Sequence, residues 1–221
     1  METNVVTDSE VNKKPSLFGV ITSPTLQFTR MKGKAPIGLP LIYMMILFAL
    51  TGTIGAYIAS DSSILKNTGA EVPKSLILTG GILGTIVTGI LGFLIAALFY
   101  KICMIIMGND TSYKTLLSVV IHASIISVVG GVINAIINLA IGTDKVMSYT
   151  SLAPLFSGKG LHAIAESFDI FHIWYYIVLG IGLHVVAGVS KNKVITLIVI
   201  MFIITLAINS LGGVIPFTNK N

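Results

Sequence analysis

Charged residues are scarce in this chain of 221 residues. Asp, Glu, Lys and Arg make up 10% of it, whereas soluble domains carry about 25%. Hydrophobic residues make up 54%, and the mean hydropathy is +0.92. A chain with so little charge cannot cover a surface that faces water. The composition therefore predicts an integral membrane protein.

Cysteine is also nearly absent, because Cys103 is the only one in the sequence. A single cysteine excludes an intramolecular disulfide and a cysteine-rich metal site. Since Cys103 lies in an apolar run, we expect it to act as a small buried hydrophobic residue.

The motifs of membrane enzymes are missing as well. The sequence contains no HExxH, no GxSxG and no GxxxxGK[ST], and its apolar segments hold no pair of aspartates. We therefore expect no enzymatic activity, no catalytic residues and no cofactor. Asp169 and His172 have a spacing that two metal ligands could use, with His162, Glu166 or His184 as further ligands. No recognisable metal pattern supports such a site, so we expect none.

Five long apolar segments are present, and a helix needs about 20 apolar residues to cross a bilayer. They cover residues 37–59, 76–100, 116–141, 170–189 and 194–215. The sequence thus predicts an all-α polytopic membrane protein with five transmembrane helices. We divide it into an N-terminal tail (1–36), a five-helix domain (37–216) and a short C-terminal tail (217–221). The polar start contains no cleavable signal peptide, so the first span is expected to stay as an anchor.

The basic residues predict the orientation, because cytoplasmic loops attract Lys and Arg. With a cytoplasmic N-terminus, the inner segments hold nine basic and four acidic residues, and the outer segments hold five of each. This favours a cytoplasmic N-terminus and an external C-terminus. The net charge of +5 is then explained by orientation in the bilayer, so we expect no nucleic-acid partner.

The segment before the first span alternates apolar and basic residues. Ser23 and Pro24 resemble an N-cap and a first helical position, which predicts a short helix. We expect this helix to lie in the membrane interface, with its apolar residues in the headgroup region and its basic residues against anionic lipid. These residues are Leu26, Phe28 and Met31, and Arg30, Lys32 and Lys34.

Small residues recur at every fourth position in the second span. Lipid tails are as apolar as leucine, so helices in a bilayer associate through close packing of small residues. We therefore predict helix-packing or partner interfaces at these stripes, although a flexible or gated helix is the functional alternative. A self-association face would use the same chemistry, which leaves a homo-oligomer open. The second span has two stripes, Gly80, Gly84, Thr88 and Gly92, and Gly81, Thr85 and Gly89. The first span has Thr51, Gly55 and Ala59 beside Gly52 and Ala56, and the fourth span has Gly180, His184 and Gly188.

Polar residues inside the spans are few, namely His122, Asn134, Asn138, His184 and Asn209. Asn134 and Asn138 lie one turn apart on the same helix face. We expect them to form hydrogen bonds across a helix interface, and a transport or ligand role is the alternative. No acidic or basic side chain lies well inside a span, which argues against an ion-coupled pump.

The stretch FDIFHIWYYIVLGIGLH, residues 168–184, opens the fourth span. Asp169 stands where a helix N-cap would, and its charge suits the positive end of the helix dipole. We expect the aromatic residues that follow to form an interfacial belt, with His172 in the same layer. These are Phe171, Trp174, Tyr175 and Tyr176.

The order of these residues resembles the fourth-span signature of bacterial members of the Yip family. Two other pieces agree, namely the linker GNDTSYKTLLSVVIHAS with Gly108 and the segment SLFGVITSPTLQF with Pro24. The resemblance covers residues 16–216, but the proline that family members often carry after the linker is missing from residues 119–133, which puts a kink in the third span in doubt. The motif positions of the fourth span are Asp169, Phe171, Trp174, Gly180, Gly182, Gly188, Val189, Ser190 and Lys191.

The family implies five spans, a cytoplasmic N-terminus and no known catalytic activity. Its eukaryotic relatives bind small GTPases in vesicle traffic, a role that should not transfer to a compact chain of bacterial type. We expect a protein of the bacterial plasma membrane that binds another membrane protein and helps it assemble. Resemblance to bacterial members implies an ABC-type exporter that protects against a toxic peptide as the partner. A transporter or channel and a membrane-shaping protein are the alternatives.

Overall fold

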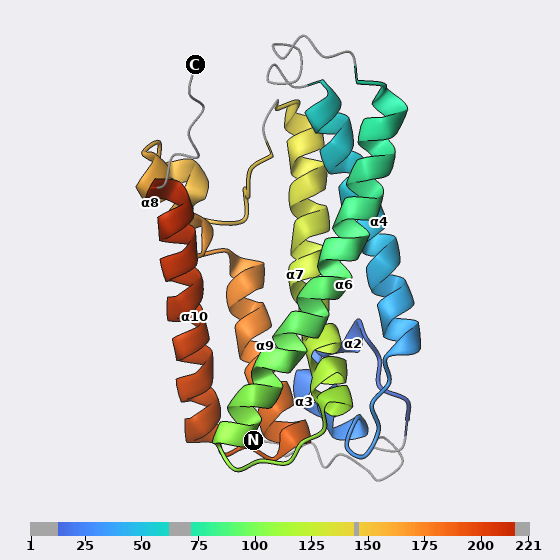
Figure 1. Cartoon of the computed structure of the whole chain (residues 1–221), viewed down its shortest axis with the longest axis vertical. Coiled ribbons are helices and arrows are strands. Elements are labelled where there is room, and N and C mark those ends of the chain that lie inside the picture. The colour runs from blue at the N-terminus through green and yellow to red at the C-terminus, as the bar shows by residue number, and fades with distance from the viewer. Residues whose placement is uncertain (1–12, 62–71, 144–145, 215–221) are drawn as a thin grey trace, which may run out of the picture.

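The computed structural model describes residues 13–61, 72–143 and 146–214, which contain helices and no strand. Five of these helices are long and apolar enough to cross a membrane, which confirms the five predicted spans (Figure 1). Their cores match the predicted segments, and α6 continues beyond its predicted end at Tyr100. The helices are α4 (Gly38–Ser60), α6 (Lys74–Ile106), α7 (Tyr113–Ile141), α9 (Ile170–Ala187) and α10 (Lys191–Val214).

Helix α7 is the centre of the bundle. In its most apolar stretch 67% of the residues are buried by the rest of the protein, compared with 22% in α4 and 11% in α6 and α10. It packs against α4, α6 and α9, whereas α10 packs against α9 and the short helix α8 (Lys159–Glu166). The helix is uninterrupted, as expected for a span without proline. The four outer helices therefore leave broad apolar faces for lipid.

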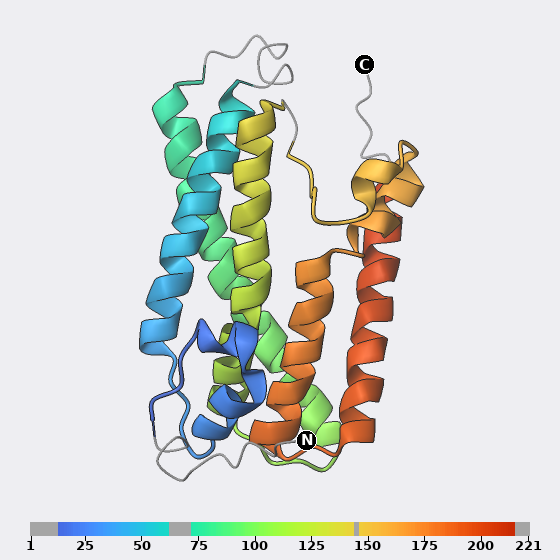
Figure 2. The same cartoon turned by 180° about the vertical axis from the view of Figure 1, so that it is seen from behind.

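The N-terminal segment folds into the bundle instead of lying on its surface. It forms α2 (Gly19–Thr22) and α3 (Pro24–Arg30), which pack beside α9 and α7 at one end of the molecule (Figure 2). Ser23 and Pro24 do occupy the N-cap and first positions of α3. However, the side chains of Phe28 and Met31 are fully buried. The expectation that they enter the headgroup region was wrong, because Gly182 of α9 leaves room for the Phe28 ring inside the protein.

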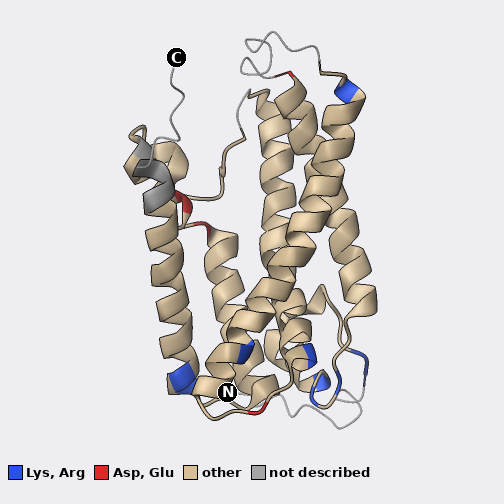
Figure 3. Cartoon of the chain, viewed as in Figure 1, with Lys and Arg blue, Asp and Glu red and all other residues tan. Residues whose placement is uncertain are grey.

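Basic side chains gather at the end of the molecule where α10 begins, which we call the basic end (Figure 3). Described acidic residues are more frequent toward the other end, where Asp61, Glu166 and Asp169 lie. The positive-inside rule would place the basic end in the cytoplasm, and this orientation stays a prediction. The described basic residues before α4, near the end of α6 and at the starts of α7 and α10 belong to it, namely Lys13, Lys14, Arg30, Lys32, Lys34, Lys101, Lys114, Lys191 and Lys193.

Helix α9 is the shortest span, with 18 residues. Figure 2 shows that it begins well below the far end of α7, next to the middle of that helix. The chain between α7 and α9 therefore descends between the helices before α9 starts. That segment carries the short helix η1 (Ala153–Leu155) and α8. Its descent creates the polar site described below.

Candidate functional site

One predicted glycine stripe of α6 packs against α4. A Cβ atom added at Gly52 would lie 2.6 Å from the carbonyl oxygen of Gly81, and one added at Gly81 would lie 2.9 Å from that of Gly52. A Cβ at Gly89 would meet the ring of Phe48. The hydroxyl of Thr85 lies 3.0 Å from the carbonyl oxygen of Phe48, which it can reach as a donor across the interface. This stripe is used inside the protein, as expected for close packing in a membrane.

The other stripe of α6 is open, and only its Gly92 end lines a cavity with residues of α9 and α10. Gly80, Gly84, Thr88 and Gly92 are exposed, and a Cβ at any of these glycines would meet no atom within 4 Å. The hydroxyl of Thr88 donates to the carbonyl oxygen of Gly84 at 2.7 Å, so it is satisfied within its own helix. We call these four residues the free glycine face. It has the same four-residue spacing of small residues as the stripe that packs against α4, but no described helix packs against it.

Three glycines of α9, two from the predicted stripe and one from the family motif, serve different purposes. A Cβ added at Gly180 would lie 3.3 Å from Val194 and 3.4 Å from Ile198 of α10, which is closer than most Cβ contacts. Gly182 packs more tightly, because a Cβ there would lie 2.6 Å from Val119 and 2.9 Å from the Phe28 ring. Gly188 ends α9 with a φ of +68°, which glycine adopts without strain. A Cβ there would meet nothing within 4 Å, so Gly188 makes no close contact with another described helix, and its role at a partner interface stays a prediction.

Asn134 and Asn138 hold the segment that descends from α7. The side-chain carbonyl of Asn138 accepts the N–H of Met147 at 2.9 Å, and its NH₂ donates to the carbonyl oxygen of Met147 at 2.7 Å. One turn earlier, the amide of Asn134 accepts the N–H of Thr150 at 3.1 Å and donates to its hydroxyl at 2.6 Å. We call this pair the asparagine clamp. The predicted hydrogen bonds exist, but their partners are the backbone of a loop and the Thr150 hydroxyl, and not another helix.

Asp169 joins the same network from the other side. Its Oδ1 atom accepts the N–H groups of Phe171 at 2.8 Å and His172 at 3.2 Å, which confirms the predicted N-cap of α9. Its Oδ2 atom accepts the hydroxyls of Ser148, at 2.8 Å, and Thr150. Burial alone would raise the pKa of this carboxyl, but the four hydrogen bonds outweigh it and hold the pKa below its ordinary value. Asp169 therefore stays ionised.

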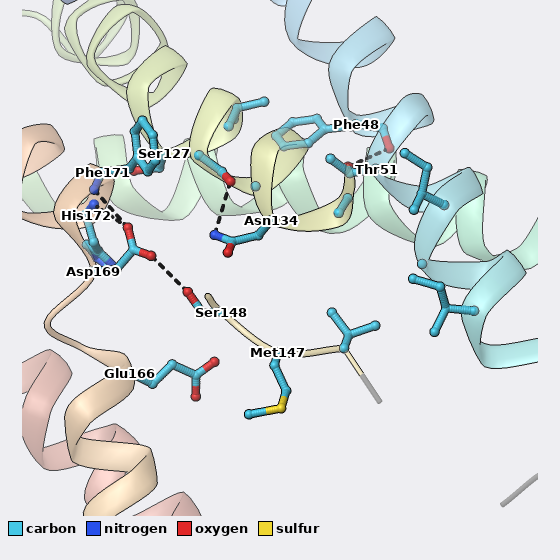
Figure 4. Close-up of a pocket in the computed structure, with 18 residues that line it drawn as sticks. Phe48, Thr51, Ser127, Asn134, Met147, Ser148, Glu166, Asp169, Phe171 and His172 are labelled. Atoms are coloured by element: carbon cyan, nitrogen blue, oxygen red, sulfur yellow. Dashed lines mark hydrogen bonds between the residues drawn. The ribbon is translucent and has the colours of Figure 1, made fainter. Parts of the chain in front are cut away.

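A cavity of about 550 Å³ lies between α4, α7, α9 and the loop 146–148. In Figure 4, Phe48 and Thr51 of α4 lie across the cavity from Asp169 and Glu166. The walls are mostly apolar, and the polar groups are concentrated where the loop meets α9. We call this the α4–α7–α9 cavity. Its polar lining residues are Thr51, Ser127, Asn134, Ser148, Glu166, Asp169 and His172.

The other intramembrane polar residues lie outside this cavity. The ring of His122 is fully buried, and its Nδ1 lies 2.7 Å from the carbonyl oxygen of Ser118. His184 Nδ1 lies 2.7 Å from the carbonyl oxygen of Val189 at the end of α9. Asn209 donates to the hydroxyl of Ser167 at 2.8 Å. Of the five predicted residues, the structure thus places only Asn134 in the cavity wall.

The aromatic residues of α9 turn inward. Trp174 donates through Nε1 to the carbonyl oxygen of Ile21 at 3.3 Å, and the Phe171 ring lies against Gly130 of α7. Tyr176 is buried, with its hydroxyl 2.7 Å from that of Thr205. The expected lipid-facing belt was wrong, because these rings bind the neighbouring elements of the bundle.

Comparison with known proteins identifies the family. The family model of the Yip1 domain matches residues 18–212. The chain belongs to the Yip1 domain family. It is 33% identical to the membrane protein YknW of Bacillus subtilis (strain 168) over 225 residues, which covers 97% of each chain. No solved structure matches it.

Two pieces of the Yip1 domain that resembled the family motifs meet at the basic end. Gly108, with a φ of +73°, ends α6 and opens the linker to α7. The next residue, Asn109, donates to the carbonyl oxygen of Ala187 at the end of α9 at 2.8 Å. Lys193 also reaches back, with its Nζ 3.4 Å from the carbonyl oxygen of Met107. Hydrogen bonds therefore connect the linker motif to the end of α9 and to the start of α10.

No group of three or more His, Cys, Asp and Glu side chains with metal-binding geometry occurs within the described residues. Asp169 and His172 meet through the N–H of His172 at the helix cap. Sequence reasoning missed Ser148, Thr150 and Phe48, which contribute to the network and the cavity. No local pattern marked them, since each acquires its role through a partner distant in sequence.

Proposed function

We propose that this Yip1 domain protein is a non-enzymatic scaffold of the bacterial plasma membrane that binds another membrane protein laterally. The free glycine face of α6 carries the proposal. Three glycines and a threonine at every fourth position expose a flat backbone strip that no described side chain covers. Such strips allow two helices in a bilayer to approach closely. The matching stripe on the other side of α6 already binds α4 in this manner.

The geometry of α6 fits this role. At about 1.5 Å per residue, its 33 residues span about 50 Å, which exceeds the hydrocarbon core of about 30 Å. Apolar side chains flank the free glycine face, and Leu83, Val87 and Leu91 are all exposed. A partner helix can therefore pack along several turns. We propose the subunits of an ABC-type exporter that protects against a toxic peptide as the first partner to seek.

Crosslinking of the tagged protein in its native membrane, followed by mass spectrometry, tests the proposal. The double variant Gly80→Leu/Gly84→Leu should fold normally and lose its partner, because leucine would fill the strip. Gly38→Leu is the matched control, since Gly38 also faces open space but lies on α4. Recovery of exporter subunits supports an accessory role, and recovery of the protein alone points to a homo-oligomer. Unchanged capture by the double variant would refute the role of this face.

The α4–α7–α9 cavity favours a second function, the binding or transport of a small solute. Its two carboxylates, Glu166 and Asp169, favour a cationic one. Glu166→Gln would remove one charge at an exposed position and should weaken uptake or binding of an organic cation. Loss of uptake with normal partner capture would support this alternative over the scaffold. A membrane-shaping role is less well supported, because Phe28 and Met31 are buried and cannot act as a wedge.

A further inference from the structure

A second cavity, of about 670 Å³, lies at the basic end between the N-terminal segment and the start of α4. Residues 14–18 form one wall and residues 34–43 form the other. We call it the entry cavity. It is separate from the free glycine face of α6 and from the α4–α7–α9 cavity, with which it shares no lining residue.

The entry cavity carries positive charge. Lys14 and Lys34, which are 20 positions apart in the sequence, both line it and both are exposed. No acidic residue is among its described lining residues. Two cations in a described lining that contains no carboxylate favour an anionic ligand, because each gains from the Coulomb attraction.

The same cavity has an exposed apolar wall. Phe18, Leu39 and Tyr43 are 50%, 64% and 41% exposed, and the rings of Phe18 and Tyr43 meet edge to face with centroids 6.1 Å apart. Leu39 and Tyr43 lie in the first turns of α4, where that span enters the bilayer. A fully water-soluble anion would gain nothing from contact with this apolar wall. A ligand with an anionic head and a hydrocarbon chain would use both parts.

Both walls are fixed to the core of the protein. On one side, the N–H of Ser16 donates to Gln27 Oε1 at 2.8 Å, and Gln27 is buried on α3. On the other side, the hydroxyl of Ser118 on α7 donates to the carbonyl oxygen of Pro36 at 2.8 Å. The spacing of the two walls is therefore set by α3 and α7. A preformed site loses less entropy on binding than a flexible one.

We propose that the entry cavity is a binding site for one anionic phospholipid. Its phosphate would lie between Lys14 and Lys34, and an acyl chain would lie along Phe18, Leu39 and Tyr43. Basic pockets at the cytoplasmic ends of membrane helices are suited to anionic headgroups. The site also revises the sequence-based expectation. We now expect lipid to contact Phe18 and Leu39 instead of Phe28 and Met31. Of the three basic residues expected to meet anionic lipid, Lys34 lines the cavity.

The test uses the full chain in nanodiscs and native mass spectrometry of retained lipid. With mixed phosphatidylglycerol and phosphatidylcholine, we expect the protein to retain phosphatidylglycerol. The variant Lys14→Ala/Lys34→Ala should weaken this retention by about tenfold or more. The control Lys32→Ala/Lys114→Ala removes the same charge from exposed positions at the same end, outside the cavity, and should retain lipid as the parent does.

A second variant separates the headgroup from the chain. Leu39→Gln keeps the charge and should also lower phospholipid retention, since it makes the apolar wall polar. Equal losses in the two lysine pairs, or equal retention of phosphatidylcholine, would overturn the proposal. Displacement by millimolar inorganic phosphate with no effect of Leu39→Gln would assign the site to a soluble anion instead. Partner capture through α6 is measured separately, so either proposal can fail alone.

Discussion

Asn138 is the residue whose replacement should be most informative about the asparagine clamp. Its side chain is fully buried and pairs with both backbone groups of Met147. Leucine has a similar size and makes neither bond. A hydrogen bond contributes about 1 kcal/mol net, so Asn138→Leu should favour detachment of the loop by about 2 kcal/mol. This corresponds to an increase of about 30-fold in the detached population.

Hydrogen exchange at the Met147 amide measures this change directly, in detergent or in nanodiscs. We expect exchange about 30-fold faster in Asn138→Leu, while amides in the middle of α7 keep their protection. Ile136→Ala is the control, because Ile136 is exposed on the same helix and its side chain has no hydrogen-bonding group. Unchanged exchange at Met147 in the leucine variant would show that the loop is held by other contacts, and the clamp would be refuted.

Three further results should follow from the packing and the charges. Gly130→Ala should lower the melting temperature, because its Cβ would lie 2.6 Å from the Phe171 side chain and overpacking costs about 1–3 kcal/mol, whereas Gly131→Ala, in open space, should be neutral or stabilising. The lowered pKa of Asp169 should stabilise the fold above the pKa of its unfolded state, and this part should vanish as pH falls through the folded pKa. Thermal melts from pH 7 down to about pH 2 should show that loss in the parent and not in Asp169→Asn. Gly188→Ala should destabilise by about 1–2 kcal/mol, measured by thermal melts, because alanine tolerates a φ of +68° poorly.

The spans were predictable from the sequence because lipid imposes one simple requirement. A segment of about 20 apolar residues has to form a helix in a bilayer, since no water satisfies its backbone. The caps were predictable for a similar reason. Asp169 satisfies N–H groups that have no partner within the helix, and that need is local. These features depend on residues close together in the sequence.

The direction in which side chains point was harder to predict. In a membrane, apolar residues suit lipid and protein equally well, so hydropathy does not say which face of a helix is buried. The aromatic residues of α9 illustrate this. Trp174 and Tyr176 resembled an interfacial belt, yet each has a polar atom paired with another segment, α2 or α10. The sequence pattern places Phe28 against lipid, although Gly182 provides room for its ring inside the protein.

The glycine stripes show the same limit. Both stripes of α6 have the same four-residue period, and only the position of Phe48 and Gly52 on α4 decides which one is used internally. A small-residue period therefore predicts that a face can pack, and the structure is needed to show whether it already does. The free glycine face is informative for that reason, since it keeps the capacity and has no described contact.

The asparagine clamp and the α4–α7–α9 cavity have a common cause. Thr150 is bound to Asn134 and to Asp169 at once, so the descending loop fixes the depth at which α9 starts. Because α9 starts next to the middle of α7, it leaves the space beyond its N-terminal end to the loop, and among the described elements the cavity occupies that region. A change that releases the clamp should therefore also reshape the cavity. A ligand that fills the cavity should in turn slow exchange at Met147, which lines it.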